Sequence, residues 1–248
     1  MTEWKLKRFW TEARPEPVEG GFTVTLDGRP VKTPAKAPLT VPTRAIAEAM
    51  AAEWDAQQEA VDPRTMPVTR AANAAIDKVA VQHGRVAEML AEYGGTDLLC
   101  YRAEAPAELV ARQEAAWDPL LAWARDALGA PLVTTRGVMH VPQPERSLQA
   151  LAAEVRGLDA FPLTALHDLV TLSGSLVIGL AAVHGHLPAR DLWLRSRIDE
   201  IWQEEQWGAD EEAAEAARRK ETAFHDAVIF FGLCAGTASR AGPGPKSA

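Results

Sequence analysis

Three short histidine motifs are the residues of this chain best suited to metal chemistry. They are His167-Asp168, His225-Asp226 and His184-Gly185-His186. Imidazole and carboxylate groups can hold a divalent ion that activates water, so the motifs are compatible with a metal-dependent hydrolase. Adjacent residues on a helix point about 100° apart, so further ligands would have to come from distant segments. Ordinary core or surface histidines are therefore the simpler interpretation, and the hydrolase is the alternative hypothesis.

Other signs of catalysis are weak. Glu204 and Glu205 are neighbours, but general acid-base catalysis needs two carboxyl groups that converge on a substrate from different environments. A solvated acidic helix face explains these two glutamates better. The chain has no glycine-rich phosphate loop, no H-E-x-x-H or C-x-x-C motif and no G-x-S-x-G elbow. We therefore predict no catalytic or metal-binding residues and no cofactor.

The stretch from Ser196 to Glu212, here called the acidic tryptophan segment, favours contact with another protein. It carries two tryptophans among acidic residues, and indole rings are enriched in interface hot spots. Helical spacing predicts an inward face of Leu194, Ile198, Ile201 and Trp202 and an outward face of Asp199, Gln203, Glu204 and Gln206. Gly208 stands where a helix would end, and Asp210, Glu211 and Glu212 suit the start of the next one. The same residues could thus serve only to shape two helices.

Composition narrows the class of protein. A chain of 248 residues with 47% hydrophobic content can bury a sizeable core. The formal charge of −8 disfavours nucleic acid as a partner. Cys100 and Cys234 lie far apart in apolar surroundings, which favours reduced, buried thiols. The apolar run from Leu163 to Val183 is interrupted by polar residues, so we expect no membrane insertion.

The elements that must position these residues change character along the chain. Gly21 to Thr33 alternates apolar and polar residues around Asp27-Gly28, which predicts a hairpin whose returning strand, with Pro30, lies at an edge or is bulged. Leu39 to Val41 could add a third strand. From Thr43 onward the periodicity is helical. We predict an α+β protein with a small β-rich lobe (1–65), a larger, mostly α-helical domain (66–235) and a mobile tail (236–248).

The helical part divides into predicted segments by its proline, glycine and capping residues. The pair Asp118-Pro119 leaves open whether the third and fourth segments are two helices or one kinked helix. The predicted segments are Val68–Lys78, Arg85–Tyr93, Ala107–Trp117, Pro119–Leu128, Ser147–Gly157, Pro162–His184, Ala189–Trp207 and Asp210–Cys234.

An ordered set of short segments resembles the ATP synthase F-one assembly chaperones that act on the alpha subunit, the family known in mitochondria as assembly factor two. The resemblance extends from near the start of the chain to Gly208. The segments are R-F-W (8–10), E-G-G-F (19–22), L-D-G-R-P-V-K-T-P (26–34), A-E-W-D-A-Q-Q (52–58), T-M-P-V-T-R-A-A-N (65–73), D-L-L-C-Y-R (97–102), W-D-P-L-L-A-W-A (117–124) and S-R-I-D-E-I-W-Q-E-E-Q-W-G (196–208).

The resemblance implies a non-catalytic chaperone that binds free alpha subunit and prevents its aggregation until the beta subunit replaces it. The family pattern falls on Glu200, Gln203, Trp207 and Glu211 as partner-binding residues, with Gly208 between the two helices. Glu204 and Glu205 depart from that pattern. Arg197 is expected to fix the helix through a carboxylate partner.

The resemblance also bears on location. Mitochondrial members carry a targeting presequence, and this sequence shows none, nor an ordinary signal peptide. We therefore expect a bacterial cytoplasmic protein that is monomeric when free and has the ATP synthase alpha subunit as its partner.

Overall fold

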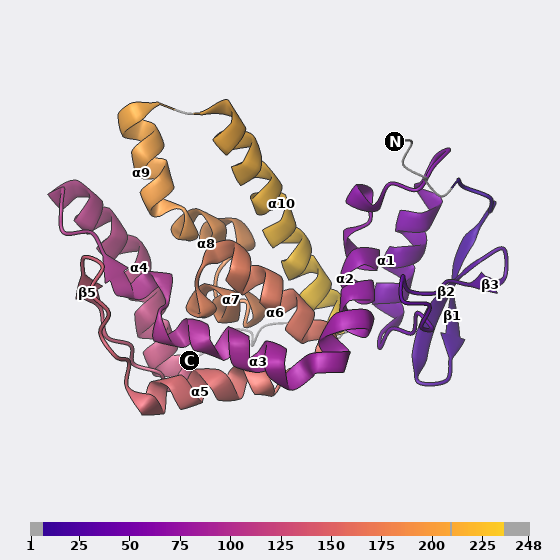
Figure 1. The fold of residues 1–248 in the computed structure, drawn as a ribbon, viewed down its shortest axis with the longest axis horizontal. Coiled ribbons are helices and arrows are strands. Elements are labelled where there is room, and N and C mark those ends of the chain that lie inside the picture. The colour runs from indigo at the N-terminus through magenta and orange to yellow at the C-terminus, as the bar shows by residue number, and fades with distance from the viewer. Residues whose placement is uncertain (1–6, 209, 236–248) are drawn as a thin grey trace, which may run out of the picture.

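The computed structural model describes residues 7–208 and 210–235, and the predicted tail at 236–248 lies outside these ranges. The predicted α+β class is confirmed, because a small antiparallel sheet precedes a larger helical body (Figure 1). No helix within the described ranges combines the length and apolar character needed to cross a membrane.

The N-terminal sheet has three antiparallel strands in the order β1 (Ala13–Val18), β2 (Gly21–Leu26) and β3 (Arg29–Pro30). The predicted hairpin turn is confirmed, since Asp27 and Gly28 have φ values of 47° and 77°, as a type I′ turn requires. Pro30 lies on an edge strand as predicted, where its missing N–H costs no ladder bond.

Two details of the sheet differ from the sequence prediction. Leu39 to Val41 is not a strand, because only Val41 pairs, through a single bridge to Phe22. Gly21 permits this close approach, since a Cβ atom there would lie 2.2 Å from the Val41 carbonyl oxygen. The strand β1 was missed because Pro15 and Pro17 interrupt its sequence, and prolines are tolerated in an edge strand.

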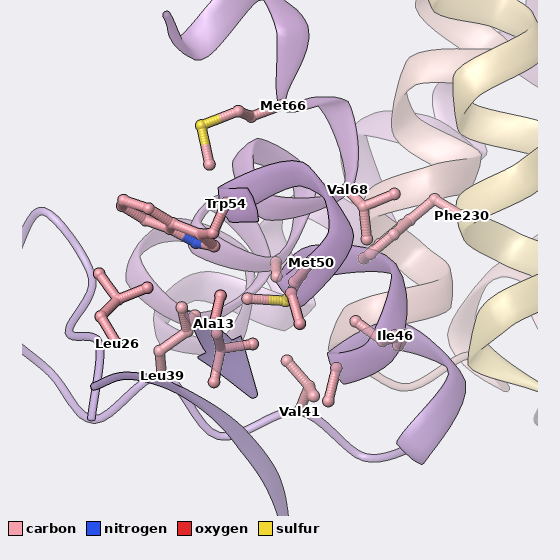
Figure 2. Packing of buried hydrophobic residues seen from close by; sticks show 14 of the residues in the cluster. Ala13, Leu26, Leu39, Val41, Ile46, Met50, Trp54, Met66, Val68 and Phe230 are labelled. Atoms are coloured by element: carbon pink, nitrogen blue, oxygen red, sulfur yellow. The ribbon is translucent and has the colours of Figure 1, made fainter. Parts of the chain in front are cut away.

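Helix α1 (Arg44–Asp55) joins the sheet to the helical body. It starts at the predicted Thr43, whose hydroxyl accepts from the Ile46 N–H and donates to the Leu233 carbonyl at the end of α10 (Glu211–Cys234). Figure 2 shows Ile46 and Met50 beside Val41 of the sheet lobe and Phe230 of α10. The sheet lobe therefore shares one core with a helix from the far end of the sequence.

The remaining helices form the body of the molecule. A π-helical turn (Ala75–Val79) and a 3-10 turn (Ala80–Gln82) connect the first two of them. The body also contains a parallel pair of two-residue strands, β4 (Tyr101–Arg102) and β5 (Thr135–Arg136). The helices are α2 (Pro67–Ala74), α3 (His83–Glu92), α4 (Ala107–Leu128), α5 (Glu145–Arg156), α6 (Ala160–Ser173), α7 (Leu176–Val183), α8 (Ala189–Ser196) and α9 (Ile198–Trp207).

The prediction of one helix over Pro162–His184 is wrong. The chain breaks at Gly174, whose φ of 72° ends α6, and Ser175 caps α7 by accepting from the Ile178 N–H. Asp97 stabilises the break, because its carboxylate accepts from the Ser175 hydroxyl at 2.7 Å and from the Val177 N–H at 3.0 Å.

The prediction of one helix over Ala189–Trp207 is also wrong. Helices α8 and α9 are separated at Arg197, which has φ −114° and ψ 15°. The open question at Asp118-Pro119 is resolved as one helix, α4, with Pro119 inside it. Asp118 pairs with the buried Arg102 at 2.7 Å.

Both cysteines are free thiols, as predicted. Cys100 is buried and Cys234 is half-buried. Burial raises the pKa of each thiol to about 12, so both stay protonated at neutral pH.

Candidate docking surface

Helix α9 is fixed against α4 along one side. The Gln113 amide donates to the Asp199 carboxylate at 2.6 Å, and Arg112 forms an ion pair of 2.9 Å with Glu205. The Arg112 guanidinium also lies over the Trp202 ring, 5.0 Å from its centroid. These contacts determine which face of α9 remains available to a partner.

Three of the four predicted partner-binding residues lie on the face of α9 turned away from these contacts. Glu200, Gln203 and Trp207 are spaced three and seven residues apart, which places them on one side of a helix. Gln203 is exposed, and Trp207 is 79% exposed at the end of the helix. An indole left in solvent loses the stabilisation that burial would give it, so Trp207 is the best candidate for a partner contact.

The fourth predicted residue, Glu211, is the first residue of α10 and is exposed. Gly208 ends α9 as predicted, with φ 91° and its N–H donating to the Glu204 carbonyl. The Asp210 side chain caps α10 by accepting from the Ala213 N–H at 2.7 Å. Glu211 thus has a structural role at a helix N-terminus and is also available to a partner.

The two helices project from the core. Ile198 is the one buried residue of α9, which the structure describes throughout. In α10, also described throughout, the buried residues are Phe224, Ala227 and Phe230, all in its second half. Figure 1 shows α9 and the first half of α10 extending beyond the other helices. We call this projection the α9–α10 arm, residues 198–208 and 210–223.

Charge on the arm is mainly negative and only partly neutralised. Arg197 pairs with Glu200 at 2.5 Å, which confirms the expected carboxylate partner of Arg197. Arg112 lowers the pKa of Glu205 by donating a hydrogen bond to it. Within the described ranges, Glu204, Glu211 and Glu212 form no ion pair. A basic partner surface would complement this arrangement.

Three of the four residues predicted to face inward are less buried than expected, and one of them, Ile201, is half-buried. Leu194 is 42% exposed, because the break at Arg197 turns α8 away from the line of α9. Trp202 is half-buried under Arg112 instead of lying in the core. The prediction treated 189–207 as one helix, and a single helical wheel cannot describe both halves.

Arg112 is the functional candidate that sequence reasoning missed. It lies in α4, 93 positions before Glu205, and no local motif marks it. Only the unneutralised glutamates of the arm could have suggested a cation on a neighbouring helix.

Among the described residues, the histidine motifs do not form a metal-like cluster, although His167, Asp168 and Asp226 line one cavity. His167 contacts its own neighbour Asp168 at 3.0 Å, and His184 contacts Glu154 at 2.9 Å. His186 stacks on Trp123, and burial, with a smaller effect of Arg195, lowers its pKa. Over residues 7–208 and 210–235, no three or more histidine, cysteine, aspartate or glutamate side chains are grouped as a metal would require.

Known proteins resemble this chain in both sequence and fold. The crystal structure of Atp12 from Paracoccus denitrificans is 53% identical, with a TM-score of 0.91, and the match covers 94% of this chain and 100% of that one. The model of the ATP12 chaperone protein family matches residues 7–125. The chain belongs to the ATP12 chaperone family. Membership identifies it as a chaperone for ATP synthase assembly.

Two further relatives agree with this assignment to the ATP12 family. The Atu1473 protein of Agrobacterium tumefaciens is 42% identical, with a TM-score of 0.88, and the match covers 91% of this chain and 85% of that one. The mitochondrial protein atp12 of Schizosaccharomyces pombe is 24% identical over 221 residues, which are 84% of this chain and 76% of the relative. The similarity therefore spans both the sheet lobe and the helical body.

Proposed function

We propose that this ATP12-family protein is a non-catalytic chaperone that binds free ATP synthase alpha subunit through the α9–α10 arm and holds it until the beta subunit takes its place. The observation that carries the proposal is Trp207, which is 79% exposed at the end of an acidic helix. Glu200, Gln203 and Glu211 complete the proposed contact surface.

The needs of the client explain why such a surface is useful. A subunit of an obligate oligomer exposes a large apolar interface before assembly, and such a patch promotes self-association. A projecting arm with few core contacts can enter an interface without disturbing the chaperone's own fold. Release needs no nucleotide hydrolysis, because the more extensive native interface displaces the chaperone by mass action.

The alternative, a metal-dependent hydrolase, has less support. His167 and His184 contact different carboxylates, and although His167, Asp168 and Asp226 line one cavity, the described residues include no group of three or more placed to hold a metal. A hydrolytic metal site needs several ligands converging on one ion.

The test is light scattering by purified alpha subunit as it aggregates, with and without this protein. Wild-type protein should suppress the scattering. Trp207→Ala and Glu211→Lys should suppress it at least several-fold less, since the first removes a central apolar anchor and the second reverses a contact charge.

Glu145→Lys is the matched control, because Glu145 is also an exposed first residue of a helix. It loses the same favourable helix-dipole interaction but lies outside the arm. If Glu211→Lys and Trp207→Ala protect the alpha subunit as well as Glu145→Lys and wild type do, the docking assignment is wrong.

A further inference from the structure

A cavity of about 420 Å³ lies where the π-helical turn after α2 meets α6 and α10. Its floor is apolar and is formed by Val79, Ala165, Ala227 and Phe230. This volume is within the range of sites that hold small ligands or a few side chains of a peptide. Among the described residues, Ala223 is the one lining residue that belongs to the α9–α10 arm, and Asp226, Ala227 and Phe230 come from the part of α10 beyond it.

Two cations line one wall of this cavity. Arg70 and Lys78 are both exposed, and neither lies within ion-pair distance of a carboxylate in the described part of the chain. The opposite wall carries Asp168, which contacts His167, and Asp226, on which Arg70 acts electrostatically across the cavity. The two walls therefore differ in charge, with an apolar floor between them.

The π-helical turn explains how both cations reach the same cavity. Arg70, Ala74 and Lys78 are four residues apart, and in a regular α-helix each such step drifts by about 40°, so Lys78 would lie about 80° from Arg70. The turn Ala75–Val79 has i→i+5 hydrogen bonds and a wider circumference, which reduces the drift. Single π-turns within helices occur frequently at functional sites.

One of the segments that line the cavity is slightly basic, against the trend of the whole chain. Residues 62–88 contain Arg64, Arg70, Lys78 and Arg85 against Asp62, Asp77 and Glu88, a net charge of +1, whereas the chain has a net charge of −8. A single carboxylate of a ligand is therefore attracted to the wall that carries Arg70 and Lys78.

We propose that this cavity binds an acidic segment of the client polypeptide, with a carboxylate directed at Arg70 and Lys78 and an apolar side chain against the floor. The identity of the client rests on the proposed function. A phosphate ion fits less well, because Asp168 and Asp226 repel a multiply charged anion, whereas a peptide can offer its N–H groups to those carboxylates. The site would be a second contact, separate from the arm.

Labelled short peptides that together span the alpha-subunit sequence provide the test, with binding to the full-length protein followed by fluorescence anisotropy. Peptides with an acidic residue next to apolar residues should bind. The double variant Arg70→Glu/Lys78→Glu should bind them at least about tenfold more weakly, because it reverses the charge of one wall. Ala74→Trp should weaken binding too, since it fills the cavity and leaves every charge in place.

Arg85→Glu is the matched control, because Arg85 is an exposed cation of the same basic segment that does not line the cavity. Its affinity should stay within about twofold of wild type, and circular dichroism should show all variants folded. Equal peptide binding by wild type and the double variant, or no bound peptide, would overturn the proposal. Complete displacement by millimolar inorganic phosphate would also overturn it, in favour of a simple anion site.

These outcomes are distinct from failure of the proposed function. Wild-type protein could suppress aggregation of the alpha subunit while its peptide binding does not depend on Arg70 and Lys78. That result would support the chaperone function and contradict only the proposed cavity site. Peptide binding could instead depend on both cations while whole alpha subunit is not protected from aggregation. That result would support the cavity as a peptide-binding site and contradict the alpha subunit as the client.

Discussion

Arg112 connects the proposed docking surface to the core through two contacts of one guanidinium group. It pairs with Glu205 at 2.9 Å and covers the ring of Trp202 at 5.0 Å. Glu205 is thereby occupied within the chain, which agrees with its departure from the family pattern. The residues left for a partner are those on the opposite face, beginning with Trp207.

Replacement of Arg112 by alanine should loosen α9 without unfolding the protein. Both of its contacts would be lost, while the Gln113–Asp199 hydrogen bond would remain. Backbone amides of α9 should then exchange several-fold faster by hydrogen-exchange mass spectrometry. Arg125→Ala is the control, because Arg125 pairs with Asp126 on the same helix. Equal exchange of α9 in the two variants would show that Arg112 does not fix the arm.

The two thiols should be nearly inert in the folded protein. Burial raises the pKa of Cys100 and of Cys234 to about 12, against about 8.5 for a free thiol. At pH 8 the thiolate fraction falls by roughly a thousandfold, so alkylation by iodoacetamide should slow by about that factor relative to protein in urea. Modification at similar rates in the two states would contradict the burial of these side chains.

The same pKa shifts define a dependence of stability on pH. The folded protein holds the thiol protons more tightly than the unfolded chain does, so their contribution to stability is fully present below pH of about 8.5. It should be lost as the pH rises from there toward about 12. The midpoint of urea unfolding should therefore decrease over this range, and less so in a Cys100→Ala/Cys234→Ala variant.

At the scale of elements, sequence patterns located most helices and missed the breaks between some of them. The start near Thr43 was predicted from the change to helical periodicity, and the end at Gly208 from the capping chemistry of glycine. Asp210 was predicted in the first turn of the last helix, and its side chain caps that helix instead. The break at Arg197 has no glycine or proline to mark it, since it depends on how α8 and α9 pack against α4. Local sequence does not record that packing.

The break at Gly174 was hidden for a different reason. The apolar run on both sides of it gives the pattern of one buried helix, and an isolated glycine is tolerated within such a pattern. The deciding partner is Asp97, a buried carboxylate 78 positions away from Ser175. Long-range hydrogen bonds of this kind cannot be read from periodicity.

Gly174→Ala should therefore destabilise the protein by about 1–2 kcal/mol, because a side chain at φ 72° is strained. Urea unfolding measures the change. Gly84→Ala is the control, since Gly84 lies in α3 with open space around its Cβ position, and there the substitution should stabilise by up to about 1 kcal/mol. A neutral Gly174→Ala would mean that α6 and α7 can join without strain.

At the scale of the whole molecule, the sheet lobe and the helical body depend on each other. The sequence predicted a boundary near residue 65, where Asp62-Pro63 and Met66-Pro67 interrupt the helical pattern that begins at Thr43. The core does not follow that boundary, since Phe230 of α10 and Val68 of α2 pack in the same cluster as Ile46 and Met50 of α1 (Figure 2). The assignment of two separate domains remains a prediction.

A second connection crosses the same boundary. The Glu53 carboxylate of α1 accepts hydrogen bonds from the Val68 and Thr69 N–H groups, at 2.7 and 2.8 Å, and so caps α2. The first turn of α2 has no cap of its own, because Met66 offers no side-chain acceptor. The helical body thus obtains one helix cap from the N-terminal lobe.

We therefore predict a single cooperative unfolding transition for both parts. Hydrogen exchange in increasing urea should give the same midpoint for peptides from residues 21–55 and from residues 163–183. Phe230→Ala should lower both midpoints together and cost about 3–5 kcal/mol, because it leaves a cavity in the shared core. Ile229→Ala, which alters the exposed neighbour, should change stability by less than about 0.5 kcal/mol.

The contrary result would be informative about how the chaperone works. If Phe230→Ala separated the two midpoints, each lobe would have its own folding unit, and the boundary near residue 65 would mark true domains. If the midpoints stay together, the sheet lobe acts as a fixed support for α10, whose first half carries Glu211. The position of the arm would then depend on the packing of Phe230 at the other end of the same helix, so Phe230→Ala should also weaken binding of the alpha subunit.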